Sequence, residues 1–254
     1  MSANDPQRLF EYLLRVADNA LISGQQLAAW VGHGPELEEE MAMANFALDY
    51  IGQARMLYSY AGEVEGRGRG EDDLAFLRDG IDFRNVLLVE QPNGDFAQTI
   101  ARQFLYDAWY LPLLEALADS SDRRLAEIAG CAAREVRYHL RHERLWVLRL
   151  GDGTGESRRR MQAAVDLLFP YAHELFAADD IDEWAAATGL GPRPDTLRPA
   201  WENTVHATLA EATLKRPESG WAARGGKQGR HTEHLGYLLA EMQFLQRAYP
   251  SAKW

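Results

Sequence analysis

Cysteine is almost absent from this sequence, since Cys131 is the only one among 254 residues. One thiol excludes an internal disulfide and any zinc site built from several cysteines. Disulfides persist in oxidising compartments, so their exclusion favours a reducing one. Cys131 falls on an apolar face of a predicted helix, one turn before Glu135. We interpret it as a structural residue and not as a nucleophile.

Long apolar runs and an excess of positive charge are also missing. No run approaches the roughly 20 residues that a membrane-spanning helix needs, and the N-terminus has no charged-then-apolar signal pattern. Lys and Arg number 27 against 38 Asp and Glu, which gives a formal net charge of −11. A nucleic-acid-binding protein needs a basic face. We therefore expect a cytoplasmic protein that has neither nucleic acid nor a membrane as a partner.

Helical periodicity covers most of the chain. Asp5 followed by Pro6 is typical of a helix start, and Asp95 with Gln98 matches a capping box. The apolar stripe of the second predicted helix, expected to face the core, contains Leu37, Met41, Ala44, Leu48 and Ile51. The predicted helices cover about 6–30, 36–62, 95–118, 122–149, 157–177, 199–214 and 231–248.

Between these helices, 62–73 is predicted to be a glycine-rich loop, 85–90 a buried apolar segment, and 178–199 a short helix with a loop. The pattern predicts an all-α protein with a ferritin-like four-helix bundle over about 6–149. About three additional helices follow over about 157–248. We expect a single domain spanning 1–254, because no linker is long enough to separate two.

Acidic residues interrupt the apolar stripes of the four predicted bundle helices, at Asp18, Asp49, Asp107 and Glu135. Ferritin-like di-iron proteins take a lone Glu from each of two helices and a Glu-x-x-His pair from each of the other two. The sequence interval from Asp18 to Asp49 is similar to the interval from Asp107 to Glu135. These intervals predict two antiparallel hairpins that each bring a pair of acids to matching heights.

The histidines that a di-iron site requires are missing. Gly52 stands three residues after Asp49, and Tyr138 stands three residues after Glu135. His139 comes one residue later, and a helix turns about 100° per residue, which swings the imidazole away from the acid. The sequence therefore predicts a metal-free polar core without catalytic residues, in which the vestigial di-iron positions are Asp18, Asp49, Gly52, Asp107, Glu135 and Tyr138.

Acids gathered in such a core must be protonated or paired with arginine or tyrosine. Two alternatives stay open at this point. One is a weakly bound, adventitious metal ion. The other is a working two-metal centre that activates dioxygen or water.

Two groups of histidines are candidates for other roles. His139 is interpreted as the i+4 partner of Glu135 on the helix surface, and with His142 it is a candidate for a subunit interface. A displaced metal site that includes Glu143 is the alternative. The run His231-Thr232-Glu233-His234 has zinc-like spacing, but Thr232 is a natural N-cap for the last helix, and we favour that role.

Residues 215–230 form the one basic stretch of the chain. Arginine and lysine among glycines before a helix can bind phosphate groups or an acidic surface. The candidates for contact with a partner protein, or with the phosphates of a coenzyme A ester, are Arg224, Lys227 and Arg230.

Several motifs from about Leu9 to Trp254 together resemble the structural, ferritin-like subunits of the bacterial phenylacetyl-CoA ring epoxidases. They are Asp49-Tyr-Ile-Gly-Gln-Ala-Arg55, Val89-Glu-Gln-Pro-Asn-Gly-Asp-Phe-Ala97, Ile100-Ala-Arg-Gln103 with Asp107-Ala-Trp109, Glu135-Val-Arg-Tyr-His-Leu-Arg141, and His231-Thr-Glu-His-Leu-Gly236 with Ala240-Glu-Met-Gln243.

The resemblance implies a ferritin-like, non-catalytic structural subunit of a multicomponent monooxygenase in phenylacetate catabolism. Its partners would be a paralogous catalytic subunit that holds the di-iron centre, a separate bridging subunit, and an NADPH-dependent flavin and iron–sulfur reductase. This chain would bind no cofactor. A homodimer of the isolated chain stays open. The alternative functions are an independent di-iron oxygenase with an Asp-rich site and a coenzyme A binding module.

Overall fold

The computed structural model describes residues 5–218, 220–250 and 252. Regular structure in these residues is entirely helical, and the predicted all-α, ferritin-like fold class is confirmed. Among these residues no helix has the length and apolar character to cross a membrane. The chain divides into two compact units, the first built from Met1–Glu90 with Gly225–Trp254 and the second from Gln91–Arg224. The single domain over 1–254 stays a prediction.

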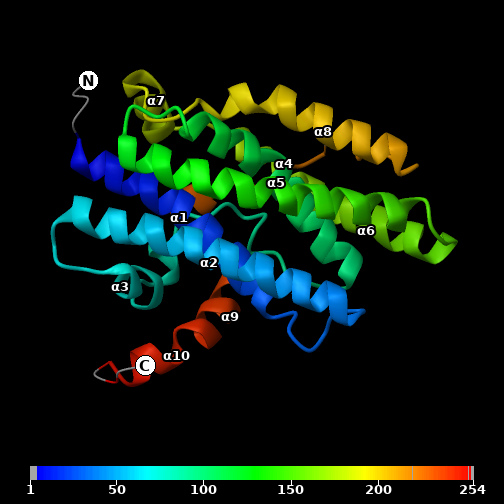
Figure 1. Ribbon diagram of the computed structural model, residues 1–254, viewed down its shortest axis with the longest axis horizontal. Coiled ribbons are helices and arrows are strands. Elements are labelled where there is room, and N and C mark those ends of the chain that lie inside the picture. The colour runs from blue at the N-terminus through cyan, green and yellow to red at the C-terminus, as the bar shows by residue number, and fades with distance from the viewer. Residues whose placement is uncertain (1–4, 219, 251, 253–254) are drawn as a thin grey trace. The chain divides into compact units, whose positions relative to one another are not determined.

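The first unit is dominated by two long helices, α1 and α2, which pack side by side (Figure 1). As predicted, Asp5 caps α1, because its carboxylate accepts the backbone N–H of Arg8 at 3.2 Å. The elements of this unit are α1 (Pro6–Ala28), α2 (Leu37–Glu65), α3 (Glu71–Phe76), η1 (Gly80–Asp82), η4 (Gly226–Gln228), α9 (Glu233–Met242) and α10 (Phe244–Ala248).

The C-terminal segment of the first unit packs against 81–90, which is largely buried at 85–90, as predicted. An added Cβ at Gly226 would lie 2.1 Å from the carbonyl oxygen of Asn85. The helix predicted over 231–248 is divided at Gln243 into α9 and α10. There the buried Gln243 amide donates to the carbonyls of Ala75, at 3.1 Å, and Arg78, at 3.0 Å.

The predicted glycine-rich loop over 62–73 is shorter than expected, because α2 continues to Glu65 and α3 begins at Glu71. The stripe predicted to face the core from α2 is on the wrong side of that helix. Leu37 is 69%, Met41 59% and Leu48 67% exposed. The buried residues of α2 include Met43, Phe46, Ala47, Tyr50, Ala54, Leu57 and Tyr58. Both faces are apolar, so periodicity alone could not choose between them.

The second unit is built around a further pair of long helices, α4 and α5, which also pack together. Its elements are α4 (Phe96–Leu117), α5 (Arg123–Gly151), α6 (Gly155–Ala172), η2 (His173–Phe176), α7 (Asp180–Thr188), η3 (Pro194–Leu197) and α8 (Arg198–Glu211). α6 and α8 each pack against both α4 and α5.

The predicted helix starts of the second unit are present. Asp95 accepts the backbone N–H of Gln98 at 3.0 Å. The Gln98 amide donates to the carbonyl of Pro92 instead of completing a capping box. Cys131 of α5 is exposed, so its predicted place on an apolar face is wrong.

The contact at Gly226 provides a test of the first unit. We expect Gly226→Ala to lower the midpoint of thermal unfolding by several degrees, since overpacking costs about 1–3 kcal/mol. Gly130→Ala is the control, because a Cβ at Gly130 meets nothing within 4 Å. In a helix that change stabilises by about 0.5–1 kcal/mol. Circular dichroism melts would measure both, and an unchanged midpoint for Gly226→Ala would contradict the contact.

Candidate functional site

Asp18 lies at the centre of a buried hydrogen-bonded cluster in the first unit. The Arg78 guanidinium donates to both of its carboxylate oxygens, with Nη1 3.1 Å from Oδ2. The backbone N–H of Arg84 donates to Oδ2 at 2.7 Å, and the Tyr58 hydroxyl donates to Oδ1. Asp18 and Arg78 are both almost entirely inaccessible to solvent. The carboxylate is therefore fully engaged within its own unit.

Electrostatics keeps Arg78 charged and Tyr58 protonated in this cluster. Burial opposes the charge on Arg78, but Asp18, Tyr58 and Asp82 together outweigh burial and raise the pKa of the guanidinium. Burial and Asp18 raise the pKa of Tyr58 well above its usual value, so its hydroxyl keeps the proton that it donates. The positive charge that a metal ion would bring to Asp18 is thus supplied by arginine.

Asp18 and Asp49 do not lie at matching heights, so this part of the predicted quartet is wrong. Gly24 of α1 faces Tyr50 and its neighbours on α2, whereas Asp18 meets Tyr58. Asp49 is therefore level with Gly24, which is about 9 Å along α1 from Asp18 at 1.5 Å per residue. The interval alone could not show how many residues the connection between the helices uses.

The position that lacks a histidine on α2 does not point into a buried site either. Gly52 is partly exposed, and an added Cβ would meet nothing within 4 Å. Asp49 is half-buried and takes part in other interactions of the chain. Neither position 49 nor position 52 therefore places a metal ligand in a buried site.

A second buried group, in the second unit, consists of Asp107, His139 and Glu143. All three side chains are fully buried, and Nδ1 of His139 lies 3.8 Å from Oδ2 of Asp107. Burial and the neighbouring Asp107 carboxylate raise the pKa of Glu143 well above its usual value. The raised pKa favours the protonated form of Glu143 beside Asp107.

The structure corrects the predictions for α5. His139 is buried and faces Asp107, so it is not the surface partner of Glu135 and offers no accessible surface to a partner. The buried face of α5 runs through Val136, His139, Glu143 and Val147, at helical spacing. Tyr138 is 57% exposed and points away from the core. His142 is half-buried and stays a candidate for an interface.

The predicted matching heights of Asp107 and Glu135 stay a prediction. Asp107 meets His139 and Glu143, which lie one and two turns beyond Glu135 on α5. Burial, then Asp107 and Glu135, raise the pKa of Tyr110, so this hydroxyl stays protonated among them.

These residues do not fit a di-iron centre. Among the described residues, no three or more His, Cys, Asp or Glu side chains are grouped so that they could hold a metal ion. Asp18 is neutralised by Arg78, and Asp107 lies against a protonated acid and an imidazole. The expectation that the acids of this core pair with arginine or tyrosine is confirmed for Asp18, which is bonded to both Arg78 and Tyr58.

Glu90 is a buried carboxylate that sequence reasoning missed. It accepts hydrogen bonds from the backbone N–H of Thr232 at 2.6 Å, from the Thr232 hydroxyl at 2.8 Å and from Asn85 at 3.0 Å. His231 Nδ1 lies 2.8 Å from the same carboxylate. The available signal was an acid directly after the apolar run 86–89, where a charge needs a partner.

The contacts of His231 remove it as a zinc ligand. Its Nε2 lies 3.1 Å from the carbonyl oxygen of Phe83 while Nδ1 faces Glu90, so both ring nitrogens must donate, as in an imidazolium. Burial lowers the pKa of His231, but Glu90, with the Phe83 carbonyl and Asp18, outweighs burial and raises that pKa. Thr232 occupies the predicted N-cap position, yet its hydroxyl bonds Glu90 and not the helix.

The basic stretch is only partly available to a ligand. Lys227 is 8% exposed, so it does not present its ammonium group at the surface, contrary to the prediction. Arg224 and Arg230 are exposed and stay predicted contacts. Arg224 belongs to the second unit, whereas Lys227 and Arg230 belong to the first.

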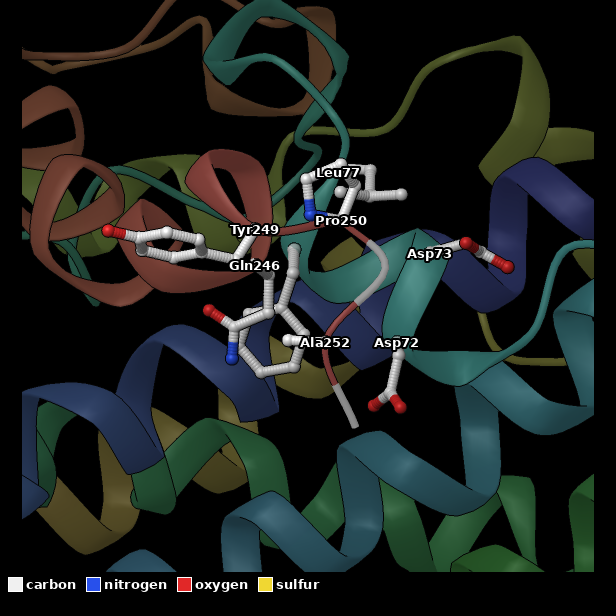
Figure 2. Close-up of a pocket in the computed structure, with 8 residues that line it drawn as sticks. Asp72, Asp73, Leu77, Gln246, Tyr249, Pro250 and Ala252 are labelled. Carbon is white, nitrogen blue, oxygen red and sulfur yellow. The ribbon is translucent and has the colours of Figure 1, made fainter. Parts of the chain in front are cut away.

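A pocket of about 340 Å³ in the first unit lies between α3 and the C-terminal segment (Figure 2). Figure 2 shows Asp72 and Asp73 on one side and Tyr249 and Pro250 on the other. Asp73 is already engaged as an acceptor for the backbone N–H of Gly70 at 2.8 Å. The described lining includes no histidine, cysteine or basic residue, so this pocket does not assemble a catalytic set.

Comparison with known proteins places the chain in a family. A family model described as phenylacetic acid catabolic protein matches residues 1–254, and the chain belongs to this family. The chain is 51% identical over 247 residues to the C subunit of the 1,2-phenylacetyl-CoA epoxidase of Escherichia coli (strain K12). That alignment covers 97% of this chain and 99% of the relative. The resemblance inferred from the sequence motifs is confirmed.

Asp18→Asn tests the buried ion pair. Without the carboxylate charge the Arg78 guanidinium is buried and uncompensated, and we expect the free energy of unfolding to fall by about 3–5 kcal/mol. Urea denaturation would measure the loss. The control is Glu183→Gln, which breaks an exposed pair with Arg193 and should change stability far less. Similar losses in the two variants would contradict a dominant role for the buried pair.

His231→Gln tests the charge at Glu90. The pKa of His231 is raised in the folded chain, so the stability it contributes is fully present below the unfolded value of about 6.5 and is lost as pH rises through the folded value. We expect the substitution to cost more at about pH 5.5 than at about pH 8.5 in urea denaturation. Gln26→Ala removes a neutral donor to the backbone carbonyl of Glu90, so it should lower the free energy of unfolding by the same amount at both pH values. Equal costs for His231→Gln would refute the charged imidazole.

Proposed function

We propose that this member of the phenylacetic acid catabolic protein family is a non-catalytic structural subunit of a phenylacetyl-CoA epoxidase in aerobic phenylacetate catabolism. The observation that supports it most is the 51% identity, over nearly the whole of both chains, to a relative named as the C subunit of that enzyme. A protein of this kind functions within an assembly. We place this chain in a cytoplasmic complex with a catalytic subunit, a separate bridging subunit, and a reductase.

In this proposal the di-iron centre belongs to the catalytic subunit, and this chain binds no cofactor. Support comes from the two predicted ligand positions whose acids are fully buried, Asp18 and Asp107. Asp18 is held by Arg78 and Tyr58, and Asp107 lies against a protonated Glu143. Iron binding would require breaking the first pair and removing the proton from the second, and both steps oppose binding. An independent di-iron oxygenase needs those same carboxylates free, so the geometry does not favour it.

The task left for the chain is to present a rigid helical surface to its catalytic partner. The buried carboxylates Asp18 and Glu90 of the first unit are paired with Arg78 and His231, so these charges have no need of a metal ion. A helix of the partner would bury its apolar surface against this chain, and the partner would remain in solution. The proposed activity of the chain is therefore stabilisation, and the chemistry is carried out by its partner.

Co-expression of the chain with the catalytic subunit from the same organism tests this function. We expect the two proteins to co-purify, and the catalytic partner to be far less soluble and less active when it is expressed alone. After anaerobic loading with ferrous iron, the purified chain by itself should hold almost no iron, while the complex holds about two atoms per catalytic partner. Iron near two atoms per isolated chain, or a fully soluble and active partner without this chain, would overturn the proposal.

A further inference from the structure

The exposed side of α2 carries an apolar seam, defined as Leu37, Met41, Ala44, Leu48 and Ile51. Successive members are separated alternately by four and three residues, which is the a/d spacing of a coiled-coil seam over two heptads. Leu37, Met41 and Leu48 are each more than half exposed, and the other two lie partly exposed. At 1.5 Å per residue the seam is about 21 Å long.

The packing of the described residues leaves Leu37, Met41 and Leu48 of this seam at the surface. α2 meets α1 mainly through the side on which Met43 and Phe46 are buried, and Ile51, at the end of the seam, also borders Gly24 of α1. A 29-residue helix with two apolar sides has more apolar surface than its own hairpin uses. Contiguous apolar surface of this kind marks an interaction site on a soluble protein.

Gly52 is a second and independent indication at the same place. Glycine in the interior of a helix costs about 0.5–1 kcal/mol relative to alanine. No contact among the described residues requires it, because an added Cβ would meet nothing within 4 Å. Gly52 directly follows Ile51, the last residue of the seam. The backbone at position 52 therefore carries no side chain where a partner helix would pack. A glycine there permits close approach of another backbone.

The charges beside the seam indicate what kind of helix fits. In the heptad frame that the seam defines, Glu38 and Glu40 occupy the e and g positions of its first heptad. Charges at e and g select a partner with opposite charges at the facing positions. A second copy of this chain would bring two net charges of −11 together, which opposes self-association. The preferred occupant is therefore a different chain with a basic flank.

We propose that the α2 seam docks an α-helix of the catalytic partner, one with an apolar a/d stripe and Lys or Arg beside it. The inference rests on the proposed function, since it assigns a surface to that pairing. The partner helix packs along the seam from Leu37 to Ile51, passes closest at Gly52, and places its basic residues against Glu38 and Glu40. Position 52 then contributes to assembly.

The test compares two matched substitutions of exposed leucines in the full-length chain. Leu48→Glu places a charge in the seam, and Leu167→Glu places the same charge on α6, where Leu167 is 53% exposed. Each variant is co-expressed with the catalytic partner, and the dissociation of the purified complex on dilution is measured by size-exclusion chromatography with light scattering. We expect Leu48→Glu to weaken binding by about tenfold or more and Leu167→Glu to bind as the unmodified chain does. Circular dichroism melts confirm that both variants remain folded.

Gly52 supplies a second pair of variants. Gly52→Trp fills open space in the isolated chain, so we expect it to fold normally and to lose partner affinity by about tenfold or more. Gly52→Ala should raise the thermal midpoint and retain much tighter binding than the tryptophan variant. If Leu48→Glu and Gly52→Trp both leave the affinity for the catalytic partner unchanged, the seam is not its docking site.

The outcomes separate the two proposals. If the unmodified chain does not bind the catalytic partner, the proposed function fails. If it binds and both seam variants bind equally well, only the seam assignment fails. If the unmodified chain self-associates, and Leu48→Glu abolishes that association while leaving partner binding intact, the seam joins two copies of this chain and the proposal is overturned.

Discussion

The buried ion pair between Asp18 and Arg78 is the constraint on which the first unit depends. It connects α1 with the segment that follows α3, and the hydroxyl of Tyr58 brings in α2. Arg78 also donates to the carbonyls of Leu74 and Asp82, so its guanidinium organises the turn that carries it. In a low-dielectric interior a charge without its partner is costly, so these three segments are stable only together.

The need to pair buried polar groups also explains the role of several motif residues. Several of the residues that carry the family resemblance make buried polar contacts between segments far apart in the chain. Glu90 binds His231 and Thr232, and Gln243 binds the carbonyls of Ala75 and Arg78. Distinctive polar residues in this chain thus hold distant segments of the first unit together.

Local features were predictable from the sequence, whereas features set by tertiary packing were not. Asp5 and Asp95 cap helices where expected, because a cap depends on the next three residues only. The level of Asp18 relative to Asp49 depends on the connection between their helices, which sequence spacing does not reveal. His139 was assigned to the surface because its i−4 neighbour is acidic, yet the buried side of α5 includes it. The need of Asp18 for arginine or tyrosine followed from charge alone.

Glu90 and Thr232 lie 142 residues apart, and this separation has a consequence for synthesis of the chain. At roughly 5–20 residues per second, a ribosome needs about 7–28 s to pass from one to the other. Throughout that time the α1–α2 hairpin has emerged, but the donors that satisfy Glu90 do not yet exist. The first unit therefore completes only near the end of translation, after all of the second has been made. A nascent chain in this interval exposes both an unmatched carboxylate and the surface awaiting α9, and is a natural substrate for chaperones.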